Sequence, residues 1–409
     1  MERTWRWFGK KDKITLAMLK QIGVEGIVTA LHDVPNGEVW TREKIHELRE
    51  YIESYGMRWS VVESLPVVES IKYAGSDRDL QIERYKESLR NLSAEGIHTI
   101  CYNFMPVLDW ARTDLLHDNP NGASNLYFSH AQFAYFDICI LKREDAEKDW
   151  SEEILREVEK LKETMTPEDD HKLVENIIVK TQGFVSGNIK EDDEHPVELF
   201  RQLLSLYKGI GKEQLRENMR YFLAAIMPTC EECGMYMCVH PDDPPFPILG
   251  LPRIVTGDED IQWFLNAVDN PHNGLTFCAG SLSAGAHNNV VELAKKYASR
   301  TWFVHLRSCH IFPNGDFTEA SHLGGRADLI ELARVFEQTE HTQDIKDVPE
   351  WRLPMRVDHG MTMLGDEQRG YNAGYSFLGR MFALGQVQGI LATVDRELGI
   401  EYKQPGFYD

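Results

Sequence analysis

Four residues that can bind a metal ion stand at the ends of four apolar segments. They are His240 in "MYMCVH" (235–240), Cys278 in "GLTFCAG" (274–280), His305 in "TWFVHLR" (301–307) and Asp358 in "MRVDHG" (355–360). A lone buried histidine or cysteine is usually a packed core residue, but four such residues at equivalent positions indicate a shared site. Two imidazoles, a thiolate and a carboxylate suit Mn, Fe, Co, Ni or Zn, whereas Mg²⁺ and Ca²⁺ prefer oxygen ligands.

Other polar residues near these segments are candidates for catalysis and substrate binding. Arg307 follows His305 by two residues, and its guanidinium suits a substrate carboxylate, although a structural ion pair is the alternative. His359 directly follows Asp358 and is a candidate acid or base. The segment "NFMPVLDWART" follows a further apolar segment, and its polar and aromatic residues could cover the same site: Asn103, Asp109, Trp110 and Arg112.

The stretch "HPDDPP" (240–245) combines one metal-binding residue with a proline-rich loop. Only His240 belongs to the apolar segment, so Asp242 and Asp243 lie on the loop that follows it. We expect these two carboxylates to orient neighbouring groups or to contact substrate hydroxyls, with capping of the loop backbone as the alternative.

The elements that position these residues are eight short apolar segments that alternate with amphipathic helices. The segments read as strands over 4–9, 25–31, 58–64, 98–104, 235–240, 274–280, 301–307 and 355–360. Predicted helices between them include 15–22, 41–55, 80–92, 258–268, 288–298 and 327–338. This alternation indicates a parallel sheet covered by helices. Eight units, with no GxGxxG after any strand, favour a closed (β/α)8 TIM barrel, in which the carboxyl ends of the strands meet at the active site.

The strand–helix spacing is interrupted once, between residues 105 and 234. We interpret roughly 113–205 as a large, mainly helical insertion after the fourth strand of a single barrel domain spanning 1–409. Such an insertion would serve as a lid or as an oligomer contact. We therefore expect a homo-oligomer, a dimer or a tetramer.

Composition limits the partners of the chain. The 409 residues carry 44 basic and 65 acidic side chains, and the net charge of −21 argues against nucleic acid or anionic membranes as partners. Apolar runs stay short of the ~20 residues of a membrane span, and the first residues lack a signal-peptide core. Together with seven scattered cysteines, which we expect to be free thiols, this predicts a cytoplasmic protein.

Long stretches of the sequence resemble the mannonate dehydratase family. They are "HPDDPPFPILGLPRIVTG", "GLTFCAGSLSAG", "GDFTEASHLGG", "VDHG" and "CYNFMPVLDWARTDL", and the resemblance runs from "TWRWFG" to about residue 390. It implies a TIM barrel similar to the xylose-isomerase-like enzymes. It also implies conversion of D-mannonate to 2-dehydro-3-deoxy-D-gluconate with loss of water, in hexuronate catabolism, using Mn²⁺ or Fe²⁺.

The resemblance also implies roles for individual residues. It supports the four metal ligands named above and His359 as a catalytic acid or base, with a tyrosine as its partner. The family's "PGYGLYDRA" corresponds to "RGYNAGYSFLGR" here, so Tyr371 is the closest match and Tyr375 the alternative. His359 and Tyr371 would then divide the two proton transfers while Arg307 holds the substrate. The family's "DHGR" reads "DHGM" in this chain.

Three other functions fit the same residues. A metal-dependent sugar isomerase or epimerase could use the same barrel and ligands, and a related dehydratase could act on another aldonic acid. A protein that binds a sugar acid without catalysis is the third alternative. The mass of the product separates a dehydratase from an isomerase, an epimerase or a binding protein, because only a dehydratase releases water.

Overall fold

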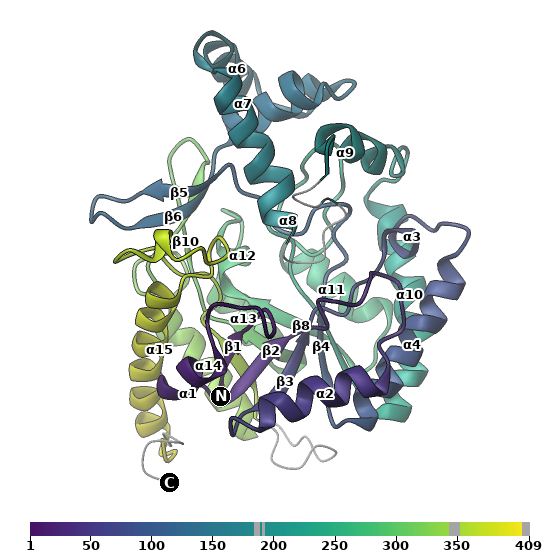
Figure 1. Ribbon diagram of the computed structural model, residues 1–409, viewed down its shortest axis with the longest axis vertical. Coiled ribbons are helices and arrows are strands. Elements are labelled where there is room, and N and C mark those ends of the chain that lie inside the picture. Colours follow the sequence, from purple (N-terminus) through teal and green to yellow (C-terminus); the bar gives the residue numbers. More distant parts are fainter. Residues whose placement is uncertain (184–188, 190–192, 343–351, 403–409) are drawn as a thin grey trace.

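Eight parallel strands close into a barrel in the computed structural model, which describes residues 1–183, 189, 193–342 and 352–402 (Figure 1). The order around the barrel is β1-β12-β9-β8-β7-β4-β3-β2. The strands are β1 (Glu2–Arg6), β2 (Gly26–Thr29), β3 (Arg58–Glu63), β4 (Thr99–Tyr102), β7 (Tyr236–Val239), β8 (Asn273–Cys278), β9 (Thr301–His305) and β12 (Pro354–Arg356). Each overlaps a predicted segment, so the predicted (β/α)8 fold is confirmed.

Helices cover the outside of the barrel. They are α1 (Leu16–Gln21), α2 (Arg42–Glu53), α3 (Glu69–Lys72), α4 (Arg78–Ala94), α10 (Lys212–Cys233), α11 (Asp258–Ala267), α12 (Ala279–Ser283), α13 (Val290–Tyr297), α14 (Leu329–Thr342) and α15 (Phe377–Leu398). Helix α2 illustrates why they form where they do. The Thr41 hydroxyl caps its first turn by accepting from the Lys44 amide, and the apolar face buries Ile45, Leu48 and Ile52.

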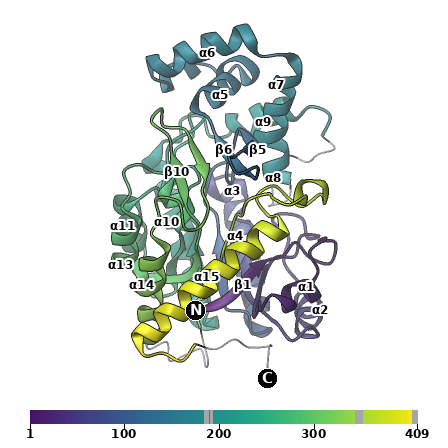
Figure 2. The ribbon, with the colours of Figure 1, turned by 90° about the vertical axis from the view of Figure 1, so that its left-hand side faces the viewer.

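Helix α15 was not predicted as a separate element. It is the one helix of the described residues that is long and apolar enough, by length and composition alone, to cross a membrane. In the structure it packs against α14 and lies along the barrel near β1 (Figure 2). Arg380 in its first turn donates a hydrogen bond to the Arg6 carbonyl on β1. We therefore interpret its apolar face as packing onto the barrel.

The long connection between β4 and α10 stands beyond one end of the barrel (Figures 1 and 2). It contains β5 (Asp114–Asp118), β6 (Ser124–Phe128), α5 (His130–Tyr135), η1 (Phe136–Leu141), η2 (Ala146–Asp149), α6 (Glu152–Thr164), α7 (Pro167–Val174), η3 (Glu175–Lys180), α8 (Thr181–Gly183) and α9 (Pro196–Ser205). The predicted insertion, 113–205, lies within this connection, and most of its elements are helical. Its hairpin β5–β6 was not foreseen. It joins β10 (Cys309–Ile311) and β11 (Phe317–Glu319) in a four-stranded antiparallel sheet.

The order of the strands brings the predicted metal ligands together. Strands β12, β9, β8 and β7 are consecutive neighbours in the barrel. Cys278 at the end of β8 is paired directly with His305 at the end of β9, and His305 is paired with Arg356 at the end of β12. Residues that are 118 positions apart in sequence, from His240 to Asp358, therefore meet at one mouth.

Candidate active site

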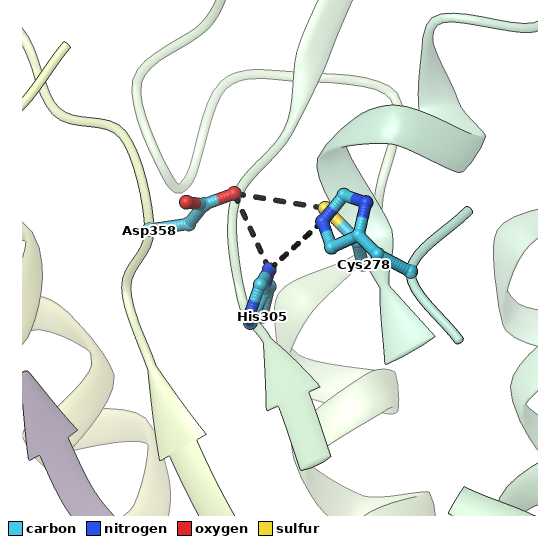
Figure 3. A group of neighbouring side chains, drawn as sticks. Cys278, His305 and Asp358 are labelled. Atoms are coloured by element: carbon cyan, nitrogen blue, oxygen red, sulfur yellow. Dashed lines mark hydrogen bonds and ion pairs between the residues drawn. The ribbon is translucent and has the colours of Figure 1, made fainter. Parts of the chain in front are cut away.

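The structure brings the four predicted metal ligands into one cluster. One ligand atom from each of His240, Cys278, His305 and Asp358 lies within 4.8 Å of the others. His240 Nε2 is 3.3 Å from His305 Nδ1, and Asp358 Oδ2 is 3.6 Å from both His305 Nδ1 and Cys278 Sγ (Figure 3). Ligand atoms bonded at about 2.0–2.3 Å to one ion lie at such separations. The arrangement fits a divalent metal ion.

Cys278 differs from the other cysteines buried in the barrel. Burial alone raises the pKa of a thiol, but Arg307 and His240 hold the pKa of Cys278 well below its usual range. Burial raises the pKa of Cys101 and Cys238 well above that range. Sγ of Cys278 also accepts from the backbone amide of Ser281 at 3.4 Å. The thiolate, which is the form that binds metals, is therefore favoured at Cys278 alone among these three.

Asp358 is fixed by two arginines and by an unusual backbone conformation. Arg307 donates to its Oδ2 at 2.5 Å and Arg356 donates to its Oδ1. Burial would raise the pKa of Asp358, but Arg356, His359 and Arg307 lower it well below its usual value. Its φ of 58° lies in the left-handed region, which is sparsely populated by residues other than glycine and is often found at functional sites. At this turn successive side chains no longer point to opposite sides as they do in a strand, and Asp358 and His359 both line the pocket.

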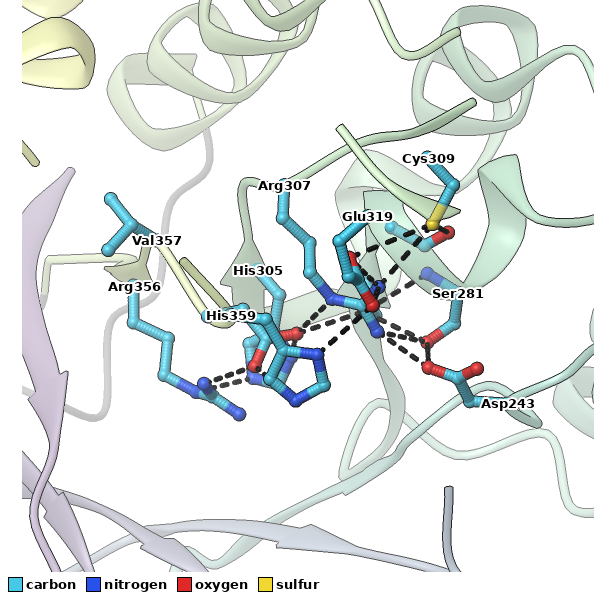
Figure 4. Close-up of polar contacts among 12 residues, drawn as sticks. Asp243, Ser281, His305, Arg307, Cys309, Glu319, Arg356, Val357 and His359 are labelled. Atoms are coloured by element: carbon cyan, nitrogen blue, oxygen red, sulfur yellow. Dashed lines mark hydrogen bonds and ion pairs between the residues drawn. The ribbon is translucent and has the colours of Figure 1, made fainter. Parts of the chain in front are cut away.

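Arg307 lines the pocket, but its guanidinium is bound by protein carboxylates. It is buried, and all three guanidinium nitrogens are engaged: Nε with Asp358, Nη1 with Glu319 at 2.8 Å, and Nη2 with Asp243 at 2.6 Å (Figure 4). A guanidinium that donates to three protein carboxylates has no free pair of N–H groups with which to bind a substrate carboxylate. The structural ion pair, which was the alternative, is what the structure shows. Arg307 positions the ligand Asp358 and stabilises the Cys278 thiolate.

His359 is buried beside a carboxylate and two aromatic rings. Its Nδ1 lies 3.2 Å from Glu319 Oε1, and its ring centroid is 5.0 Å from that of Trp110 and 5.1 Å from that of Tyr375. Burial would raise the pKa of Glu319, but Arg307 and Arg112 lower it to about 2. An ionised Glu319 fixes the ring of His359 and favours a proton on Nδ1, so that Nε2 is the atom available for proton transfer.

The structure places the two candidate tyrosines in different pockets. Tyr371, the closest match by sequence, lines a different pocket with residues of β5 and α7. Tyr375 is buried and lines the same pocket as His359 and the candidate ligands His240 and Asp358. The turn around Gly374 (φ 78°) places Tyr375, four residues after Tyr371, against the His359 ring. Tyr375 is therefore the better candidate for the partner of His359.

The predicted substrate-binding residues separate into two groups. Asn103, Asp109, Trp110 and Asp243 line the pocket together with the metal ligands His240 and Asp358. Asp242 instead accepts from the backbone amides of Ile254 and Val255, both at 2.7 Å, and so closes the loop after β7. This is the geometry of the capping alternative for Asp242. Asp243 is bound to Arg112 and Arg307, so its side chain is held by the protein.

Four charged residues of the pocket or its ion-pair network were not predicted. Arg6 and Glu63 end β1 and β3, and Arg356 ends β12, so the rule that identified the metal ligands would have found them. Glu319 ends β11, a short strand in the connection after β9 that was not predicted from the sequence. Glu63 binds Arg356 through both carboxylate oxygens, at 2.7 and 3.1 Å.

The buried carboxylates predict loss of stability in acid. Burial opposes ionisation, but neighbouring arginines lower the pKa of Glu63 and of Glu319 from 4.5 to about 2. Each carboxylate thus contributes about 3 kcal/mol above pH 4.5, which is lost as the pH falls towards 2. Urea unfolding of chelator-treated protein at pH 6, 4 and 3 measures this loss. The double variant E63Q/E319Q should be less stable at pH 6 and should show a smaller loss towards pH 3, and a loss equal to that of the wild type would contradict the prediction.

Together, the fold and the site define a TIM-barrel enzyme with a candidate divalent-metal centre and a buried histidine–tyrosine pair. Comparison with known proteins identifies the family. A family model described as D-mannonate dehydratase (UxuA) matches residues 1–401, and the chain belongs to this family of hydro-lyases.

Individual mannonate dehydratases are similar to this chain over nearly its whole length. A mannonate dehydratase of Marinomonas sp. is 43% identical over 402 residues, covering 98% of this chain and 99% of that protein. One of Chromohalobacter salexigens is 40% identical over 401 residues, covering 98% and 100%. The crystal structure of mannonate dehydratase from Streptococcus suis serotype 2 matches with a TM-score of 0.78 and 32% identity, over 100% of this chain and 99% of that one.

Proposed function

We propose that this chain removes water from D-mannonate to give 2-dehydro-3-deoxy-D-gluconate, a step of hexuronate catabolism. Family membership supports the reaction. The observation that carries the proposal is the placement of His359 and Tyr375 in one pocket with His240 and Asp358, two members of the four-residue cluster. A metal site with an acid and a base beside it is what β-elimination from a sugar acid requires.

The elimination needs two proton transfers. A base removes the proton from C2, beside the carboxylate, and an acid protonates the hydroxyl that leaves C3, so that the C3–O bond breaks and water departs. The resulting enol becomes the 2-keto acid by moving a proton to C3. A bound divalent ion supplies Lewis acidity that favours the charge developing on the substrate carboxylate.

The surroundings of the two residues suggest how they divide these transfers. Glu319 holds Nδ1 of His359, which makes Nε2 a suitable base for the C2 proton. Burial raises the pKa of Tyr375, with Arg356 opposing this shift, so the phenol keeps its proton at neutral pH and can donate it to the leaving hydroxyl. We therefore propose His359 as the base and Tyr375 as the acid.

The choice of tyrosine gives a direct prediction. Tyr375→Phe should lower kcat by about 10²-fold or more, because a general acid typically contributes 10²–10⁴-fold. Tyr371→Phe, four residues earlier and in another pocket, is the matched control and should keep nearly wild-type kcat. Steady-state assays of both variants decide between them. The reverse order of effects would restore Tyr371 as the catalytic tyrosine.

For the metal we propose Mn²⁺ or Fe²⁺, with Co²⁺, Ni²⁺ and Zn²⁺ suited to the same ligands. The test of the function is to load the protein with each ion, add D-mannonate and analyse the product. We expect a 2-keto-3-deoxy acid whose mass is that of D-mannonate less one water. A product of unchanged mass would instead indicate an isomerase or epimerase.

Location and assembly are part of the same proposal. We propose a cytoplasmic enzyme that acts on a small sugar acid and that forms a dimer or a tetramer. The helical elements between β4 and α10 stand beyond the barrel end, where they would serve as a lid or as a contact between subunits (Figure 2). Sedimentation velocity of the whole chain, with and without the α6–α7 segment, tests the subunit contact.

A further inference from the structure

Within the part of the chain that the structure describes, one buried arginine of the pocket forms no ion pair with a carboxylate. Three arginines line it: Arg6, Arg307 and Arg356. Arg307 binds Asp243, Glu319 and Asp358, and Arg356 binds Glu63 and Asp358. Among the described residues, no carboxylate lies within ion-pair distance of Arg6.

Arg6 is nevertheless placed as precisely as the other two. It ends β1 and is only 4% exposed, and its Nη1 is buried without a hydrogen-bond partner. Its Cζ lies 5.1 Å from the centre of the Phe8 ring, which supports one face of the guanidinium. Strand β1 pairs in parallel with β12, and Arg3 lies opposite Met355. Arg6 and the candidate metal ligand Asp358 each stand three residues further on, at the same end of the barrel.

An unpaired buried guanidinium is costly, because it loses water without gaining a counter-charge. The nearest protein candidate, Glu63, cannot compensate it fully, since Arg356 occupies both of its oxygens. Hydroxyl groups of a ligand would supply hydrogen bonds but no charge. A ligand carboxylate supplies both, in the geometry that a guanidinium fork matches best.

We propose that Arg6 binds the carboxylate group of the substrate, the role that Arg307 cannot fill. This inference rests on the proposed function, in that it takes the substrate to be a sugar acid. It also accounts for a buried arginine that, among the described residues, forms no ion pair although it lies beside the candidate metal ligands. Arg6 is thus a determinant of specificity for aldonic acids over the corresponding neutral polyols.

The test compares two ligands that differ at one end. D-Mannitol keeps the carbon chain and hydroxyls of D-mannonate and replaces the carboxylate by a hydroxymethyl group. Calorimetry on metal-loaded protein in a His359→Asn background, where turnover is slow, measures both affinities. Arg6→Met should weaken D-mannonate binding about 10- to 100-fold, as expected for the loss of hydrogen bonds between charged groups, and should leave D-mannitol binding unchanged. Arg6→Lys keeps the positive charge but loses the two parallel N–H donors of the guanidinium. Its affinity for D-mannonate should lie between the affinity of Arg6→Met and that of the parent protein with Arg6.

A matched control and a stability readout separate this role from a structural one. Arg3→Met removes another buried arginine of β1, one that is ion-paired with Glu25 at 2.8 Å, and should destabilise the fold without changing the affinity for D-mannonate. Ligand-free Arg6→Met should melt at or above the wild-type temperature, because an unpaired charge is removed, and should retain its metal. Equal affinity of Arg6→Met and its parent for D-mannonate would overturn the proposal. Loss of affinity for both ligands would overturn it too. If the wild type binds D-mannonate through Arg6 but releases no water, the proposed function fails and the assignment of Arg6 stands.

Discussion

Replacing His359 by asparagine should lower kcat for D-mannonate by about 10²–10⁴-fold while the protein keeps its metal, because a positioned base contributes that factor. Asparagine is similar in size and can still donate a hydrogen bond to Glu319, but its amide cannot accept a proton. The Asp358 carboxylate is held by Arg307 and Arg356 independently of the imidazole, so the metal ligands should stay in place. Turnover and metal content, measured on the same preparation, check both parts.

The matched control is His310→Asn, which removes an exposed imidazole from β10. It should leave kcat unchanged. Full activity of His359→Asn with metal retained would remove His359 from the mechanism. Loss of metal together with activity would instead show that His359 acts by supporting Asp358, its neighbour in the chain.

Strand direction explains why most of the candidate metal ligands could be expected to gather at one mouth of the barrel. In a parallel barrel every strand ends at the same mouth, so the polar residue that closes an apolar segment is placed without knowledge of any side-chain contact. His240, Cys278 and His305 follow this rule, and so do the unpredicted Arg6 and Glu63. Asp358 lies two residues beyond β12, and its left-handed turn, which the sequence pattern does not show, brings it to the site.

The partners of the charged residues could not be predicted, because they depend on which loops meet over the mouth. Glu319 reaches His359 only because the connection after β9 folds into a sheet with the β5–β6 hairpin. The same loop saturates Arg307, so a residue with suitable chemistry and position has no capacity for substrate. The two tyrosines of "RGYNAGYS" are separated by a turn at Gly374 that sends them into different pockets. The alternation of side chains between the two faces of a strand does not extend into such loops, so it cannot place their residues.

Replacing Cys278 by alanine should abolish tight metal binding, and activity with it. The thiolate is one of the four candidate ligands, and its low pKa, set by Arg307 and His240 against the effect of burial, means that it is ready to bind without losing a proton first. Even partners that only orient a ligand typically contribute about 10–100-fold to metal affinity, so loss of a ligand itself should cost at least about 10²-fold. Metal content after dialysis against a weak chelator, together with the rise in melting temperature on adding Mn²⁺, measures this effect.

Cys101→Ala provides the matched control, because Cys101 is also buried on a barrel strand, but its pKa is raised and it is not a member of the candidate metal cluster. That variant should lose some stability through the cavity it leaves and should retain metal and turnover. Cys278→Ser separates charge from size. A neutral hydroxyl is a poorer ligand than a thiolate for the softer ions. We therefore expect Cys278→Ser to lose most affinity for Fe²⁺ and Zn²⁺ and least affinity for Mn²⁺. If Cys278→Ala kept its metal and bound D-mannonate normally, three ligands would suffice, and Cys278 would belong to the ionic network around Arg307 instead of to the metal centre.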